Sequence, residues 1–324
     1  MPRGNPLLTD QEFVELYNSK GPVYIQKTIG LARRNVQQRR QRLERRLGVE
    51  IRSPNGDGYG RIPGPRAKWR LDLDFQDGVI IVASDCHYWP GNVPFMHKVL
   101  VRHIKELKPK ILVLNGDVMD FPKISRHPSI GWENRPNVQE EIEFAQEMTH
   151  EIAMALPRGA QKIWTMGNHD ERFSNRLANQ NQEYAKVNGF QLKDHFPVWE
   201  PAYQVYINPA AGHEAILIHH RFKGGEHAIS NNLKWTGCHS VTGHLHKAEI
   251  RALTYYNDRT IWGVDTGCVA EPNSSAFEYT RGAPTGWREG FAILTLRGCR
   301  LLHPELVLRW DEKHIQFRGE IIKP

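Results

Sequence analysis

Seven residues with carboxylate, amide or imidazole side chains constrain this chain of 324 residues more than any other feature. They occur in short strings spread over residues 85–246, and five of them end or closely follow short apolar runs. Continuous apolar runs of this length are typical of strands buried on both faces. The pattern therefore predicts an α/β sheet whose strands end in polar side chains. The seven residues are Asp85, His87, Asp117, Asn168, His219, His244 and His246.

The spacing of these runs predicts strand–helix–strand units. The apolar runs cover residues 79–83, 111–114, 162–166 and 215–218. Apolar residues at helical spacing occupy 95–107, and Asp85 and Asp117 lie 32 residues apart, about the length of one such unit. Because open α/β sheets place their sites at the ends of successive strands, we expect the seven side chains to converge at one edge.

Glycines stand directly before three of these strings. Gly116, Gly167 and Gly243 each precede a candidate ligand, where a residue without a side chain lets the backbone turn sharply or approach closely. Oxygen and imidazole ligands suit Mn²⁺, Fe or Zn²⁺. Two such ions, roughly 3.5–4 Å apart, are a recurring means of attack on phosphorus. The sequence therefore predicts a two-metal site.

The strings, taken in order, resemble the signature of the calcineurin-like metallophosphoesterase superfamily. They are Asp85-x-His87, Gly116-Asp117-x-x-Asp120, Gly167-Asn168-His169-Asp170, a lone histidine after a strand, and Gly243-His244-x-His246. The resemblance covers about residues 78–250 and is closest to phage and bacterial members. It implies a two-sheet αββα sandwich and a metal-dependent phosphoric ester hydrolase that uses two divalent ions and no organic cofactor.

The resemblance also implies a role for each residue. One ion would take Asp85, His87 and His246, the other Asn168, His219 and His244, and Asp117 would bridge them. His219 is followed by His220 where relatives usually have glycine, so either could be the ligand, and strand phase and the family pattern favour His219. His169 would be the catalytic histidine, with Asp170 or Asp120 steadying its neighbourhood.

The chemistry that this site would perform is hydrolysis of a phosphoester. Two dications lower the pKa of a shared water, so a bridging hydroxide can attack phosphorus while His169 donates a proton to the leaving group. Manganese is the preferred ion, with iron, zinc or nickel as alternatives. Arg126, His127 and Arg172 follow the motifs and could contact the substrate phosphate, although a place on the loop surface explains them equally well.

A second feature is the uneven distribution of charge. Residues 1–66 hold 13 Lys and Arg against 6 Asp and Glu, whereas the rest of the chain carries no net charge. Thr9 and Glu12 form the pattern of a capping box, and Gly21-Pro22 and Gly30 separate three short amphipathic segments. The third segment would be held by Val36, Leu43 and Leu47, among others. This pattern predicts a basic, helix-turn-helix-like domain.

The third of these segments would read DNA. Base or phosphate contacts are expected from Arg33, Arg34, Gln37, Gln38 and Arg40. Two residues fit the motif poorly, because Gln26 stands where a small residue is usual and Arg39 where an apolar one is. The alternative is a solvated arginine-rich helix used for protein contact or solubility.

The chain is expected to form three parts. These are a basic domain at 1–52, a Gly/Pro-rich linker at 53–68 and a catalytic domain at 69–324, whose strand-like segments at 260–264, 291–296, 306–310 and 314–322 would build a second sheet. Four scattered cysteines indicate neither a zinc finger nor a disulfide framework. No signal-like or membrane-spanning segment is apparent, so we expect a soluble cytoplasmic protein with no membrane partner.

These features together favour a phosphodiesterase or nuclease with DNA as its partner. The runner-up is a nucleotide or protein phosphatase, because nucleases and phosphatases of the superfamily share the same metal ligands. A DNA-binding regulator with a vestigial metal site is the third alternative, although the complete set of ligands argues against it. The motifs leave the oligomeric state open.

Overall fold

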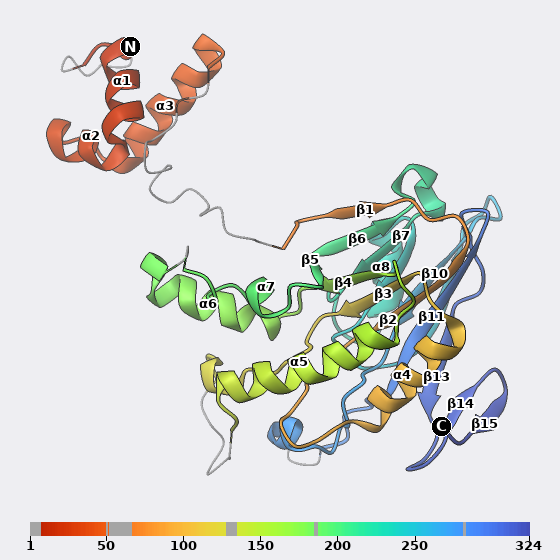
Figure 1. Ribbon diagram of the computed structural model, residues 1–324. Coiled ribbons are helices and arrows are strands. Elements are labelled where there is room, and N and C mark those ends of the chain that lie inside the picture. The colour runs from red at the N-terminus through yellow and green to blue at the C-terminus, as the bar shows by residue number, and fades with distance from the viewer. Residues whose placement is uncertain (1–7, 50, 52–66, 128–134, 185–186, 281–282) are drawn as a thin grey trace. The chain divides into compact units, whose positions relative to one another are not determined.

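The computed structural model describes residues 8–49, 51, 67–127, 135–184, 187–280 and 283–324. The chain divides into two compact units, Met1–Gly64 and Pro65–Pro324 (Figure 1). Most of the expected linker, residues 53–66, lies outside the described residues.

Three helices form the described part of the first unit: α1 (Asp10–Lys20), α2 (Pro22–Ile29) and α3 (Arg33–Leu47). The predicted capping box is confirmed, since Thr9 accepts a hydrogen bond from the backbone of Glu12 and the Glu12 carboxylate accepts one from the backbone of Thr9. Gly30 ends α2 in a left-handed conformation and opens the short turn into α3.

A small apolar core holds these three helices together. Its fully buried members are Phe13, Tyr17, Ile25, Val36, Leu43 and Ile51. The expectation that Leu47 also packs there is wrong, because its side chain is 49% exposed. Leu47 is the last residue of α3, and the buried apolar side chain after this helix is Ile51.

In the second unit the described strands form one sheet of nine and one of six. The nine-stranded sheet has the order β15 (Glu320–Ile322), β14 (Ile315–Phe317), β13 (Glu305–Arg309), β11 (Gly290–Arg297), β2 (Gly78–Ala83), β3 (Ile111–Asn115), β4 (Gln161–Thr165) and β5 (Glu200–Ala202), with β12 (Arg300–Leu301) paired to β11. Strands β2 to β5 are parallel to one another, and β11 is antiparallel to β2.

The six-stranded sheet has the order β1 (Leu71–Leu73), β6 (Gln204–Ile207), β7 (Ile216–His219), β8 (His239–Thr242), β10 (Thr260–Asp265) and β9 (Glu249–Thr254). Strands β7, β8 and β10 run parallel. The expectation that the late strands all build the second sheet is therefore wrong, because β11 and β13 to β15 extend the sheet of β2. The segment 314–322 is also a hairpin of two strands, turned at Arg318 and Gly319 with positive φ.

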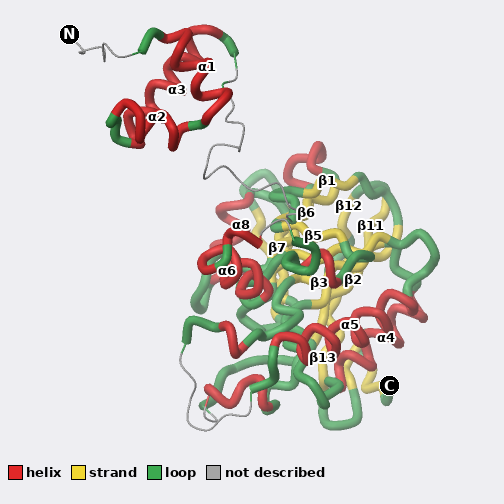
Figure 2. The backbone as a smooth tube through the Cα atoms, turned by 60° about the vertical axis from the view of Figure 1, so that its left-hand side comes forward, coloured by secondary structure: helices red, strands yellow, loops and turns green. Residues whose placement is uncertain are grey.

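Alternate side chains of the central strands enter two different cores. In β2, Ile80 and Val82 pack between the two sheets, while Ile81 and Ala83 pack against helices on the outer face. This two-sided burial is why the strand reads as a continuous apolar run. Helices pack on the outer face of the nine-stranded sheet, and the helix Ala228–Thr236 packs against β8, β9 and β10 of the six-stranded sheet. This arrangement is the αββα sandwich that the resemblance implies (Figure 2).

The spacing of apolar side chains predicts one of the helices of the second unit. On the nine-stranded sheet, α4 (Phe95–Leu107) matches the predicted helix at both ends and lies beside α5 (Val138–Ala155) (Figures 1 and 2). Further helices are α6 (Asp170–Gln180), α7 (Leu192–His195) and α8 (Ala228–Thr236), with 3₁₀ turns η1 (Pro122–Ile124), η2 (Gln182–Tyr184), η3 (Pro209–Glu214) and η4 (Ser275–Thr280). Among the described residues, no helix is long and apolar enough to span a bilayer.

Candidate metal centre

The candidate ligands lie just past the carboxyl ends of β2, β3, β4, β7 and β8, strands that belong to both sheets. Five of these residues have a left-handed backbone with φ between 40° and 69°: Asp85, His87, Asp117, His244 and His246. Such conformations cost on the order of 1 kcal/mol each and persist where the surroundings impose them. Their concentration in these loops indicates a functional site.

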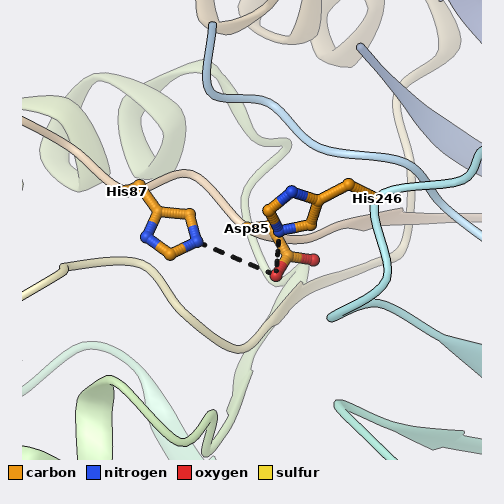
Figure 3. A group of neighbouring side chains, drawn as sticks. All are labelled: Asp85, His87 and His246. Carbon is orange, nitrogen blue, oxygen red and sulfur yellow. Dashed lines mark ion pairs between the residues drawn. The ribbon is translucent and has the colours of Figure 1, made fainter. Parts of the chain in front are cut away.

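One group of ligand-type atoms consists of Asp85, His87 and His246 (Figure 3). The Nε2 atom of His246 lies 3.0 Å from Asp85 Oδ1, and Nε2 of His87 lies 4.0 Å from the same oxygen. All three side chains are buried. Both rings point toward one carboxylate oxygen, as the ligands of a shared cation would.

The second group contains Asp117, His220 and His244. His220 Nε2 lies 3.1 Å from Asp117 Oδ2, and the His220 and His244 rings are 5.3 Å apart. The structure thus places His220, rather than His219, in this group. His219 is the last residue of β7, and its Nε2 atom lies 3.4 Å from Ser240 Oγ. The strand phase that favours His219 stops at the strand end, where the backbone turns toward the site.

The pKa values of the two neighbouring histidines are shifted in opposite directions. Burial opposes a charged ring, but the carboxylates of Asp117 and Asp85 outweigh it and raise the pKa of His220 to about 10. Burial and the charge of His220 lower the pKa of His219 to about 4. His220 therefore faces an excess of negative charge that a cation can neutralise.

Four buried atoms of the site make no hydrogen bond among the described residues: Asp85 Oδ1, His87 Nε2, Asn168 Oδ1 and His220 Nε2. Two of them, Asp85 Oδ1 and His220 Nε2, lie in close ion pairs with His246 and Asp117. A buried polar atom without a partner is costly, and a metal ion is one way to satisfy it. The donors are carboxylate, amide and imidazole, which suits divalent transition metals. The residues present therefore fit a metal centre, and Asn168 fits it as a neutral oxygen ligand.

His169 lies beside both groups. Its Nδ1 atom is 2.5 Å from Asp120 Oδ1, and Nε2 is 3.9 Å from Asp117 Oδ2. Burial opposes a charged ring, but the carboxylates of Asp117 and Asp120 outweigh it and raise the pKa of His169. Arg172 is brought to the same place, with one guanidinium nitrogen 3.3 Å from His169 Nε2. Asp120, rather than Asp170, makes the contact that orients the ring.

Three buried carboxylates hold the ligand-bearing loops through backbone amides. Asp170 accepts hydrogen bonds from the backbones of Asp117, Val118 and Gly167 and from the Trp164 indole. Its position next to His169 in the sequence is why it was expected to be a catalytic residue that steadies the His169 ring. In the structure its carboxylate supports the loops instead.

The other two loop-holding carboxylates were not expected from the sequence. Glu141 accepts hydrogen bonds from the backbones of Asp120 and Phe121, and Asp265 accepts them from Lys247, Ala248 and Gly267. Burial raises the pKa of Glu141 to about 8 and that of Asp265 to about 7. Both had a signal, because Glu141 interrupts the apolar face of α5 and Asp265 ends an apolar strand.

The motif glycines allow the closest contacts in the site. A Cβ atom on Gly116 would lie 2.4 Å from the His220 ring, and one on Gly167 would lie 2.2 Å from Asp117 Oδ1. Gly116 also has a φ of +81°, whereas Gly167 is required for close approach alone.

Replacement of Gly167 by alanine is expected to displace the Asp117 carboxylate and to lower metal affinity about 10- to 100-fold, the scale seen when support for a metal ligand is lost. Competition with a chelator measures this affinity. Gly224→Ala is the matched control, because its Cβ would meet no atom within 4 Å and its backbone is not left-handed. Unchanged affinity in Gly167→Ala would contradict the placement of Asp117 in the metal centre.

The remaining candidate substrate contacts, Arg126 and His127, are exposed on the loop after η1. Among the described residues, no hydrogen bond or ion pair joins either of them to the metal-binding groups. Contact with the substrate phosphate therefore stays a prediction for Arg126 and His127, and a place on the loop surface explains them equally well.

The predicted DNA-contacting residues of α3 separate into two sets. Arg34 and Gln38 are exposed, whereas Gln37 donates a hydrogen bond to the Tyr17 hydroxyl and Arg40 lies over the Tyr17 ring. The side chain of Arg33 lies outside the described residues. Arg39, at the position where an apolar residue was expected, pairs with Asp10 at 2.8 Å and covers the Phe13 ring.

A sequence model of one protein family matches the part of the chain that carries these groups. It describes calcineurin-like phosphoesterases and matches residues 78–248, more than half of the chain. The chain belongs to the calcineurin-like phosphoesterase family. The phosphoesterase is 26% identical over 255 residues to the Gene 54 proteins of Mycobacterium phages D29 and L5, an alignment that covers 70% of this chain and 92% of each relative.

Two solved structures are also similar to the phosphoesterase. One is the Pseudomonas putida nuclease MPE, with a TM-score of 0.29 and 11% identity, covering 76% of this chain and 87% of that one. The other is a dimetal phosphatase from Danio rerio, with a TM-score of 0.34 and 9% identity, covering 76% of this chain and 98% of that one.

Proposed function

We propose that the chain is a two-metal phosphodiesterase or nuclease that acts on DNA. The observation that carries this proposal is a set of three largely buried groups of ligand-type atoms: Asp85, His87 and His246; Asp117, His220 and His244; and His87 with Asp120 and His169. One ion would be held by Asp85, His87 and His246. The other would be held by Asn168, His220 and His244, with Asp117 between them. His220 takes the place that the sequence pattern gave to His219.

Bound ions would supply an activated water and positive charge beside the phosphoryl group. The residues of this chain supply the remaining steps. Asp120 holds the His169 ring through Nδ1, which leaves Nε2 to donate a proton to the leaving oxygen. Arg172 lies within reach of that same nitrogen and can pair with a phosphate oxygen. Membership of the family supports hydrolysis of a phosphoester bond, and the positive charge of the first unit favours DNA as the substrate that contains this bond.

A substrate panel tests this proposal. The purified chain with Mn²⁺ is expected to hydrolyse DNA and a small phosphodiester such as bis-(p-nitrophenyl) phosphate faster than p-nitrophenyl phosphate. Preference for the monoester would favour the alternative, a nucleotide or protein phosphatase. Absence of hydrolysis with any divalent ion, combined with DNA binding, would favour a regulator with a vestigial site.

The exposed face of α3 is the proposed DNA contact of the first unit. Arg34, Gln38, Gln41, Arg42 and Arg45 are exposed at helical spacing on this face. Arg39 and Arg46, by contrast, both pair with Asp10 and contribute to the stability of the helical unit. This proposed face keeps Arg34 and Gln38 from the DNA-contacting set that the sequence predicts and adds Gln41, Arg42 and Arg45.

Replacing Arg34, Arg42 and Arg45 together by glutamine is expected to weaken duplex DNA binding and to flatten its salt dependence. Each phosphate contact contributes a slope of about 0.9 in log affinity against log salt, so the slope should fall by about 2–3. Lys20→Gln/Lys27→Gln, at exposed positions on α1 and α2, is the control. An unchanged slope in the triple variant would mean that α3 is a protein-contact or solubility element.

A further inference from the structure

Two large aromatic side chains next to the metal centre are exposed and share one ammonium group. Trp235 on α8 is 71% exposed, and Phe222 in the loop after β7 is 46% exposed. The Lys223 Nζ atom lies 4.3 Å from the Trp235 ring centre and 4.9 Å from that of Phe222. Single exposed aromatics are common, but two rings joined by a cation form an organised surface. We refer to Phe222, Lys223 and Trp235 as the aromatic platform.

The aromatic platform begins two residues beyond the metal centre. The Phe222 ring lies 5.5 Å from the ring of His219, whose neighbour His220 lies 3.1 Å from Asp117. The loop is tied down from the other side, because Lys247 Nζ donates hydrogen bonds to the backbone oxygens of Gly225 and Glu226. Lys247 itself directly follows His246. A substrate phosphate in the metal centre would therefore place its neighbouring groups within reach of these rings.

The charge of this region favours a polyanion. Residues 220–236 contain the basic side chains Arg221, Lys223 and Lys234 and one acidic side chain, Glu226. Arg221 is exposed between His220 and the platform. Within the part of the chain that the structure describes, neither Arg221 nor Lys223 pairs with a carboxylate. No carboxylate among the described residues therefore neutralises either charge, and the Lys223 ammonium contacts only the two rings.

We propose that the aromatic platform binds single-stranded nucleic acid next to the phosphate that is cleaved. Bases would stack on Phe222 and Trp235, and backbone phosphates would pair with Arg221 and Lys223. Stacking on aromatic side chains accepts every base, because each base has a flat face, and it requires bases that are not already stacked in a duplex. This inference rests on the proposed function and specifies its substrate as a single strand at the site of cleavage.

The test compares Phe222→Ala/Trp235→Ala with Tyr256→Ala/Trp310→Ala, which removes two exposed aromatics elsewhere in the same unit. Full-length, Mn²⁺-loaded proteins are titrated with a fluorescent single-stranded phosphorothioate oligothymidine. Their kinetics are then measured on an unmodified oligothymidine and on bis-(p-nitrophenyl) phosphate. Phe222→Ala/Trp235→Ala is expected to lose roughly 10-fold or more in affinity for the single strand and in kcat/KM for the oligothymidine. The control variant should match the wild type in both quantities, and both variants should hydrolyse bis-(p-nitrophenyl) phosphate at the wild-type rate.

A second variant guards against a local loss of structure. Lys223→Gln keeps both aromatic side chains and removes one positive charge, so it should lower the salt slope of single-strand binding by about 0.7, the value for one phosphate contact on a single strand. The proposal is overturned if both platform variants bind the oligothymidine as the control does, which would leave a protein partner as the occupant. Failure of the wild type to hydrolyse any phosphodiester would instead refute the proposed function, and the binding arm would still decide the role of the platform.

Discussion

Replacing His169 by alanine is expected to lower turnover of a DNA phosphodiester by about 10²- to 10⁴-fold, the usual contribution of a general acid. The metal content should not change, because His169 contacts Asp120 and Arg172 and lies outside both groups of proposed ligands. The loss should be much smaller for a diester with a nitrophenolate leaving group, which departs without a proton. Steady-state kinetics on the two substrates, with metal analysis on the same samples, measure both effects.

The control for this experiment is His150→Ala, since His150 is an exposed histidine on α5. It should match the wild type on every substrate. If His169→Ala lost the same factor with good and poor leaving groups, the histidine would act in binding or positioning and would not be the acid.

Replacing Asp117 by asparagine is expected to remove one or both metal ions and to lower hydrolysis by at least about 10²- to 10³-fold, the scale of losing one charge-stabilising group in an active site. Asparagine keeps the size of the side chain and can still accept the backbone hydrogen bond from His169 at 2.8 Å, so the loop should hold. The wild type should contain two ions per chain and respond more strongly to Mn²⁺ than to Mg²⁺, because imidazole ligands favour the softer ion.

Asp72→Asn is the matched control, because it removes an exposed carboxylate on β1 that pairs with Arg70. Elemental analysis decides the outcome. Two tightly bound ions and full activity in Asp117→Asn would show that Asp117 does not bridge the two sites, and the proposed metal centre would have to be redrawn.

The sequence predicted the parts of this fold that follow from periodicity and chain order. The apolar runs 79–83 and 111–114 form β2 and β3, because a strand that is buried on both faces requires apolar residues at nearly every position. Helix α4 was predicted to the residue. The sheet to which each late strand belongs could not be predicted. Strand β11 pairs with β2, more than 200 residues earlier, and the strands of the other sheet are also apolar and could have paired with it.

The site shows the same division. The strings predict ligand-type residues at successive strand ends, and the structure brings Asp85, His87 and His246, and likewise Asp117 and His244, into groups of ligand-type atoms. The choice between His219 and His220 depended on where β7 ends and how the next residue turns, which no periodicity encodes. Glu141 and Asp265 stand out in the sequence as charged residues in apolar surroundings, but their role could not be predicted, because they accept hydrogen bonds from backbone amides, which are the same in every residue except proline.

The left-handed backbones of Asp85, His87, Asp117, His244 and His246 bear on any attempt to move this site into another protein. Aspartate and histidine are among the few residue types with a side chain that tolerate such φ values. The need for a metal ligand and the left-handed backbone therefore favour the same residue types at these positions. Glutamate can bind metal ions elsewhere, but it is rarely found at such φ values, and its longer side chain would place the carboxylate at a different distance from the backbone. A designer who grafts only the side chains onto an ordinary strand end would therefore aim them wrongly, and the loops have to be transplanted with them.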